Sequence, residues 1–212
     1  GIIKSAYGGE TVESYDVKKL YRNLYTTSSK VIALVDVPEL TYIMLDGVGN
    51  PSVDEFKLKS KALQMVSREL RNYFKDEILY TVPPLEGIWD TYDNSHFDVT
   101  RKKMIKFTLM MVQVPSLTEQ ILNQIKLDLS LRTDNPYILD VYLKKRKGER
   151  AVQLLHKGAY HTEINSTKKI MEYITVENYK LAGMHHEIYL NKPEKTAEED
   201  LKTIIRYAIE RG

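Results

Sequence analysis

Several features that commonly mark a protein's class are missing from this sequence. None of its 212 residues is cysteine, which excludes disulfide bonds, thiolate metal ligands and a cysteine nucleophile. The most apolar stretches, 31–48 and 104–114, are interrupted by polar or charged side chains and fall short of the roughly 20 apolar residues of a membrane helix. No signal-peptide pattern is visible. We therefore expect a cytoplasmic protein without a membrane partner.

An excess of positive charge is also missing. Lys and Arg total 31 against 29 Asp and Glu, a net charge of +2, whereas duplex-DNA binders usually carry a basic face or a strongly basic domain. The basic run at 144–147 is most simply a solvated hairpin tip. The chain also contains none of the G-x-G-x-x-G, P-loop, G-x-S-x-G or H-E-x-x-H motifs. We expect no nucleic acid partner and no cofactor.

The five histidines raise the question of a metal site. His185 and His186 are adjacent, so in a strand their side chains point to opposite faces and cannot readily bind one ion. We expect no metal site.

Aromatic residues are dominated by tyrosine, with 15 Tyr against 4 Phe and 1 Trp. A tyrosine combines an apolar ring with a polar tip and suits the wall of a ligand cavity. Most of these tyrosines are expected at strand edges and at the rim of the core. Tyr42 and Tyr160 are our candidates for ligand contact.

The first half of the chain alternates extended and helical patterns. The expected elements are a short helix at 15–25, a hairpin of strands 31–37 and 41–45, a helix at 54–76, and extended runs at 80–90 and 104–114. Ser52 and Glu55 have capping-box spacing at the start of the long helix. Pro83 and Pro84 predict that the run at 80–90 is an edge strand or is bulged.

The second half repeats this order. A helix with a capping box at Ser116 and Glu119 precedes a hairpin of strands 137–144 and 150–155, a helix at 162–176 and an extended run at 181–190. The final segment, 201–209, fits either a helix or a strand. We expect one α+β domain over 1–212, built from two pseudo-repeats at about 30–115 and 136–209 with antiparallel sheets around a central cleft. Two ordinary α+β halves would give a similar pattern.

The run at 184–190 alternates as a strand does. Its apolar side should pack under the helix at 162–176, leaving His185, Glu187 and Tyr189 on the other side, which the pattern alone predicts to be solvated. If that side lines a cleft, Glu187 can attract a cation or act as a general base, with a pKa raised by partial burial. Tyr189 could then orient water or stabilise an oxyanion.

The first half offers Glu86 and Trp89 as counterparts. Their odd separation places them on opposite faces of a regular strand, unless Gly87 allows a bulge. Glu86, Trp89 and His185 complete the predicted ligand-binding set.

Four motifs give the chain a family resemblance. They are His-His-Glu-Ile-Tyr-Leu at 185–190 with Asn-Lys-Pro at 191–193, the hairpin segments around 35–39 and 45–49, Pro-Leu-Glu-Gly-Ile-Trp at 84–89, and Lys-Thr-Ile-Ile-Arg at 202–206. In this order they resemble the GyrI-like small-molecule-binding family, in its stand-alone bacterial branch, from about residue 15 to residue 207.

The resemblance implies a duplicated strand-helix-strand-strand fold with a central cleft. It also implies that 202–208 is a strand and that Glu187 faces the ligand. Related domains sense lipophilic cationic drugs, and some stand-alone members hydrolyse cyclopropane-bearing genotoxins with acid and aromatic residues. The namesake inhibits DNA gyrase by protein contact. Three hypotheses follow: a binder of hydrophobic or cationic small molecules, a hydrolase with Glu187 as base and Tyr189 as its partner, and a protein-interaction module.

Overall fold

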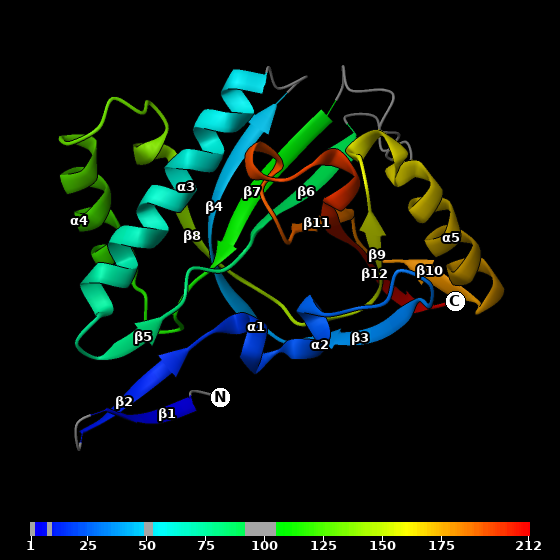
Figure 1. The fold of residues 1–212 in the computed structure, drawn as a ribbon, viewed down its shortest axis with the longest axis horizontal. Coiled ribbons are helices and arrows are strands. Elements are labelled where there is room, and N and C mark those ends of the chain that lie inside the picture. The colour runs from blue at the N-terminus through cyan, green and yellow to red at the C-terminus, as the bar shows by residue number, and fades with distance from the viewer. Residues whose placement is uncertain (1–2, 8–9, 49–52, 92–104) are drawn as a thin grey trace.

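The protein is an α+β structure built on one large antiparallel sheet with two long helices against it (Figure 1). It is described here from a computed structural model, which covers residues 3–7, 10–48, 53–91 and 105–212. No helix within these residues is long and apolar enough to cross a membrane.

Eight strands form the path of the large sheet, and each neighbouring pair is antiparallel. In spatial order they are β3 (Ala33–Val37), β9 (Glu149–Lys157), β12 (Lys202–Arg211), β11 (His185–Tyr189), β6 (Leu85–Thr91), β7 (Ile105–Val112), β4 (Leu40–Val48) and β8 (Tyr142–Arg146). A ninth strand, β10 (Tyr179–Leu181), pairs with β12. A smaller sheet holds β1 (Ile3–Tyr7), β2 (Glu10–Tyr15) and β5 (Ile78–Tyr80).

Both predicted hairpins are wrong. Within the described chain β3 pairs with β9, whereas β4 pairs with β7 and β8. Each half thus gives one strand to the other half, and the order is symmetric about the central β6–β11 pair. A turn signal specifies a local chain reversal, but distant contacts decide which strands pair. That the halves arose as two repeats stays our interpretation of this symmetry.

The helices are α1 (Val17–Leu20), α2 (Arg22–Tyr25), α3 (Val53–Phe74), α4 (Glu119–Ser130) and α5 (Glu163–Val176). The helix expected at 15–25 is therefore two short turns. Helix α4 begins later than predicted, because Thr118, rather than Ser116, accepts the capping hydrogen bond from Ile121 N at 3.2 Å. Ser52 lies outside the described residues. The described part of the chain also has four 3₁₀ turns, at Ile138–Asp140, Tyr160–Thr162, Pro193–Lys195 and Glu198–Asp200.

Strand β6, which carries part of the site, is a central strand of the sheet. Pro83 and Pro84 precede β6 and leave its ladders to β7 and β11 intact, so the predicted edge strand or bulge is wrong.

The last segment is a strand, β12, as the resemblance implied. It is buried on both faces, since α5 packs on one and the α1–α2 segment lies on the other, where Arg206 Nη2 donates to Leu24 O at 2.7 Å.

Helices α3 and α5 cover the same face of the sheet. Phe56 of α3 stacks on Trp89 of β6 with ring centroids 5.9 Å apart, and Ile170 of α5 packs in a cluster with Tyr207 of β12. Trp89 is the register partner of His185, which hydrogen bonds to Tyr207, so these side chains share one face. In Figure 1 the central strands β6 and β11 lie between these two helices.

Candidate functional site

Strand β11 presents different chemistry to its two faces. His185, Glu187 and Tyr189 lie on the face that carries the helices, whereas His186 and Ile188 lie on the other. The expectation that the apolar side packs under the helix at 162–176 is wrong, because α5 covers the polar side. The neighbouring strand β12 supplies the apolar surface for α5, so β11 can place polar groups beside the start of that helix.

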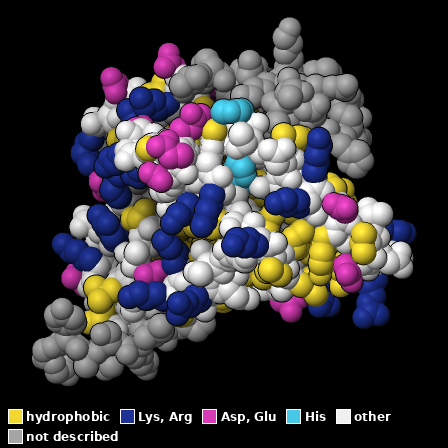
Figure 2. All heavy atoms as spheres, turned by 45° about the vertical axis from the view of Figure 1, so that its right-hand side comes forward, with side chains coloured by type: hydrophobic (Ala, Val, Ile, Leu, Met, Phe, Trp, Pro, Cys, Tyr) yellow, Lys and Arg dark blue, Asp and Glu magenta, His cyan; other side chains and the backbone are white. Residues whose placement is uncertain are grey.

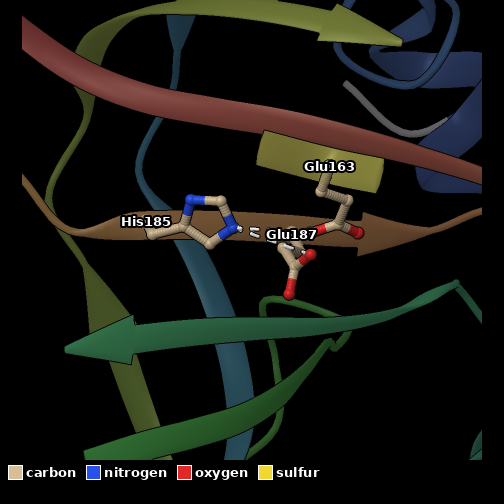
Figure 3. Close-up of side chains that lie close together, drawn as sticks. All are labelled: Glu163, His185 and Glu187. Atoms are coloured by element: carbon tan, nitrogen blue, oxygen red, sulfur yellow. Dashed lines mark ion pairs between the residues drawn. The ribbon is translucent and has the colours of Figure 1, made fainter. Parts of the chain in front are cut away.

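Glu163, His185 and Glu187 form a compact buried cluster (Figure 3). His185 Nε2 lies 3.8 Å from Glu163 Oε2 and 3.6 Å from Glu187 Oε2. The exposed fractions of the three residues are only 2%, 1% and 7%, respectively. Glu163 is the first residue of α5, while His185 and Glu187 are two apart on β11. The fold therefore brings together groups from two elements in a water-poor environment.

Three further polar groups hold this cluster in place. The Tyr207 hydroxyl hydrogen bonds to His185 Nδ1, which turns Nε2 towards the carboxyl groups. The Tyr189 hydroxyl donates to Glu187 Oε1 at 3.1 Å and accepts from Trp89 Nε1 at 3.2 Å. Trp89 thus connects β6 to the polar row of β11 across the centre of the sheet.

The predicted rise in the Glu187 pKa is wrong. Burial alone would raise it, but hydrogen bonds from Glu163, His185 and Tyr189, together with the charge of His185, outweigh burial and hold the pKa at about 2, against an ordinary 4.5. Two carboxyl groups that share a hydrogen bond hold one proton between them, and the lowered pKa of Glu187 favours its ionised form. Glu187 is therefore the ionised member, with strong affinity for positive charge and weak basicity.

Aromatic rings surround the cluster. Trp89 stacks on Phe56 and on Phe107, whose rings also contact each other, and Tyr160 makes an edge contact with Tyr189 at 6.1 Å between centroids. Gly87 lies opposite Glu187 in the sheet, and a Cβ there would lie 2.9 Å from Trp89 Nε1 and 3.0 Å from the Tyr189 hydroxyl. The missing side chain lets these two groups meet beside the carboxylate.

A groove of about 910 Å³ runs along α5, and His185 is the member of the cluster that lines it. Trp89 and Tyr207 also line the groove, and Met171 and Met184 are among its apolar walls. Its volume is that of a site for a drug-sized molecule. Figure 2 shows a group of exposed hydrophobic side chains on this side of the molecule.

The remaining two candidates, Glu86 and Tyr42, are not in this site. Both are buried on the opposite face, where Glu86 Oε1 lies 2.7 Å from His186 Nε2 and Glu86 Oε2 accepts from the Tyr25 hydroxyl at 3.4 Å. The continuous register through Gly87 excludes a bulge, so Glu86 and Trp89 do face opposite ways. The structure thus brings together Trp89, Tyr160, His185, Glu187 and Tyr189 and separates Glu86 and Tyr42 from them.

The sequence profile of the GyrI-like small molecule binding domain matches residues 31–209. The chain belongs to the GyrI-like family. No curated protein matches it.

Solved GyrI-like structures share the fold over most of the chain. An uncharacterized conserved protein from Listeria innocua is 25% identical, with a TM-score of 0.81 over 92% of this chain and 98% of its own. A protein described as a hydrolase from Listeria innocua is 24% identical, with a TM-score of 0.82 over 93% of this chain and 100% of its own. The C-terminal domain of EcmrR is 16% identical, with a TM-score of 0.58 over 86% of this chain and 98% of its own.

Within this GyrI-like site, Glu163 is the residue that the sequence did not reveal. An acidic side chain in the first turn of a helix is normally explained by the helix dipole, so Glu163 carried no separate signal. Only the packing of α5 on the sheet places it beside Glu187, which is 24 positions further along the chain.

Proposed function

We propose that this GyrI-like protein captures lipophilic cations, with Glu187 as the acidic anchor and the aromatic rings around it as the apolar wall. The observation that carries the proposal is the placement of Glu187: the residue is only 7% exposed, and its carboxyl group accepts a hydrogen bond from the Tyr189 hydroxyl and lies 3.6 Å from His185 Nε2, contacts that lower its pKa. A carboxylate charge placed in this way attracts a cation strongly, because little water screens it. The same low pKa makes it a poor proton acceptor at neutral pH.

The aromatic residues support a cationic and flat ligand. Trp89, Tyr160 and Tyr189 lie around the carboxylate, and aromatic faces attract cations by about 0.5–2 kcal/mol each. The groove beside them offers the volume for a drug-sized molecule. A binding site for a delocalised organic cation requires a negative charge and aromatic surface around it, and both are present here.

Binding of tetraphenylphosphonium, compared with its neutral analogue triphenylphosphine oxide, tests this proposal. We expect saturable binding of the cation and at least tenfold weaker binding of the neutral compound. Equal affinities would sink the anchor role of Glu187 and leave only an apolar site.

A second candidate function is hydrolysis of a cyclopropane-bearing electrophile. The hydrogen-bonded pair of Glu163 and Glu187 favours it, because one carboxyl group carries a proton that ring opening can use while the other can orient the attacking water. A structural relative of the whole chain is described as a hydrolase. Consumption of a cyclopropane-bearing alkylator over many turnovers, lost in Glu187→Gln, is the expected result for this function. Stoichiometric binding without product would exclude it.

A further inference from the structure

We infer that Glu163, His185 and Glu187 form a binding site for one divalent transition-metal ion, of which Zn²⁺ is the best-fitting example. The inference rests on the same site as the proposed function but names a different, inorganic ligand. Each of the three residues offers one ligand atom, and all three atoms lie within 4.8 Å of one another.

The separations fit a small tetrahedral ion. Zinc bonds to imidazole nitrogen and carboxylate oxygen are about 2.0–2.1 Å long, which places tetrahedral ligands about 3.3–3.4 Å apart. His185 Nε2 lies 3.6 Å from Glu187 Oε2 and 3.8 Å from Glu163 Oε2. Both distances exceed the tetrahedral value by only a few tenths of an ångström. Three protein ligands leave a fourth position for water or another small ligand.

The orientation of His185 gives independent support. Metal-binding histidines almost always use their second ring nitrogen in a hydrogen bond that fixes the ring and its tautomer. Here the Tyr207 hydroxyl, on the neighbouring strand β12, occupies Nδ1 and directs Nε2 at both carboxyl groups (Figure 3). The Tyr189 hydroxyl likewise holds Glu187 Oε1, which leaves Oε2 on the side of His185.

The charge balance also favours a divalent ion. Binding removes the proton that Glu163 shares with Glu187, so that two carboxylates and a neutral imidazole surround the ion and the net charge is zero. The phenols that face the cluster add no negative charge, because they stay protonated. Burial raises the pKa of Tyr160 to about 12 and also raises the pKa values of Tyr189 and Tyr207. Because protein groups bind a metal in their deprotonated form, we expect at least one proton to be released when the ion binds.

Calorimetric titration of the full chain with Zn²⁺, in buffers of different ionisation enthalpy, tests the inference. We expect one ion per chain and the release of at least one proton. When Co²⁺ replaces Zn²⁺, its visible spectrum should change from the pink of the free ion to the blue of a tetrahedral site. Glu163→Gln should weaken binding at least 100-fold. Tyr207→Phe keeps all three ligands and should weaken it about 10- to 100-fold.

His161→Asn is the matched control, because His161 is an exposed histidine beside Glu198 and outside the cluster; its affinity should equal that of the wild type. If Zn²⁺ does not bind, or binds equally to Glu163→Gln and the wild type, the inference is overturned. Far-UV circular dichroism checks that each variant is folded. If Glu163→Gln does not fold, the affinity of Tyr207→Phe for Zn²⁺ tests the inference instead. The tetraphenylphosphonium measurement is separate, so a failed metal site leaves the proposed function standing.

Discussion

Trp89 Nε1 donates a hydrogen bond to the hydroxyl of Tyr189 at 3.2 Å, which joins the two central strands on the side that carries Glu187. The two residues are 100 positions apart, and the contact exists only because β6 and β11 pair at the centre of the sheet. The Tyr189 hydroxyl in turn donates a hydrogen bond to Glu187 Oε1 at 3.1 Å, so the position of the indole and the position of the carboxylate are coupled.

Gly87→Ala should disturb this coupling without unfolding the protein. The new methyl group would lie 2.9 Å from Trp89 Nε1 and 3.0 Å from the Tyr189 hydroxyl, which must separate to make room. We expect cation affinity to fall about tenfold and the emission of the single tryptophan to shift. Unchanged emission and unchanged affinity would show that the contact does not organise the site.

Gly47→Ala should lower the stability of the fold. Gly47 lies in β4, and a Cβ there would come within 1.9 Å of the buried Phe107 ring. Overpacking of this kind costs about 1–3 kcal/mol, measurable by urea unfolding. In a Phe107→Leu background the cost of Gly47→Ala should shrink, because the obstructing ring is gone. An equal cost in both backgrounds would contradict the packing explanation.

Glu86→Ala should destabilise the fold strongly. Glu86 is fully buried beside His186 and the Tyr25 hydroxyl, so its removal leaves buried polar partners without their carboxylate. Breaking such a network by removing one partner costs about 3–5 kcal/mol. Glu172→Ala, at an exposed position of α5, is the control and should cost less than about 0.5 kcal/mol. A loss below about 1 kcal/mol for Glu86→Ala would mean that the network is not stabilising.

The pH dependence of unfolding should carry the signature of Glu187. Its folded-state pKa of about 2 lies below the ordinary 4.5, so its contribution to stability is complete above pH 4.5 and disappears as the pH falls towards 2. Urea unfolding at stepped pH should therefore show a shallower acid loss for Glu187→Gln than for the wild type. Glu172→Gln should follow the wild-type curve. Parallel curves for all three proteins would contradict the low pKa.

The sequence predicted the alternation of β11 correctly but not what lies on each side of it. The alternation of side chains correctly predicted that His185, Glu187 and Tyr189 share a face. It also predicted that this face is solvated, whereas the face is buried. Burial comes from α5, whose packing is a long-range event. The same limit explains Glu163, whose only local signal is its place at a helix start.

Strand β12 shows a second limit. Residues 203–209 are buried almost without a break, because helices or helical turns cover both faces of the strand. A run that is buried on both sides does not show the alternation of a half-exposed strand, so its sequence fitted both structures. The resemblance resolved the ambiguity where the pattern could not.

The central claim is that an ionised Glu187 anchors a lipophilic cation, and one titration tests it most directly. Trp89 is the only tryptophan and lies in the site, so its fluorescence should report tetraphenylphosphonium binding to the wild type and to folded Glu187→Gln. Loss of a charged partner costs about 1.5–3 kcal/mol, so the account predicts about tenfold to hundredfold weaker binding by Glu187→Gln, with triphenylphosphine oxide affected little. Equal affinity of both proteins for the cation would contradict the account.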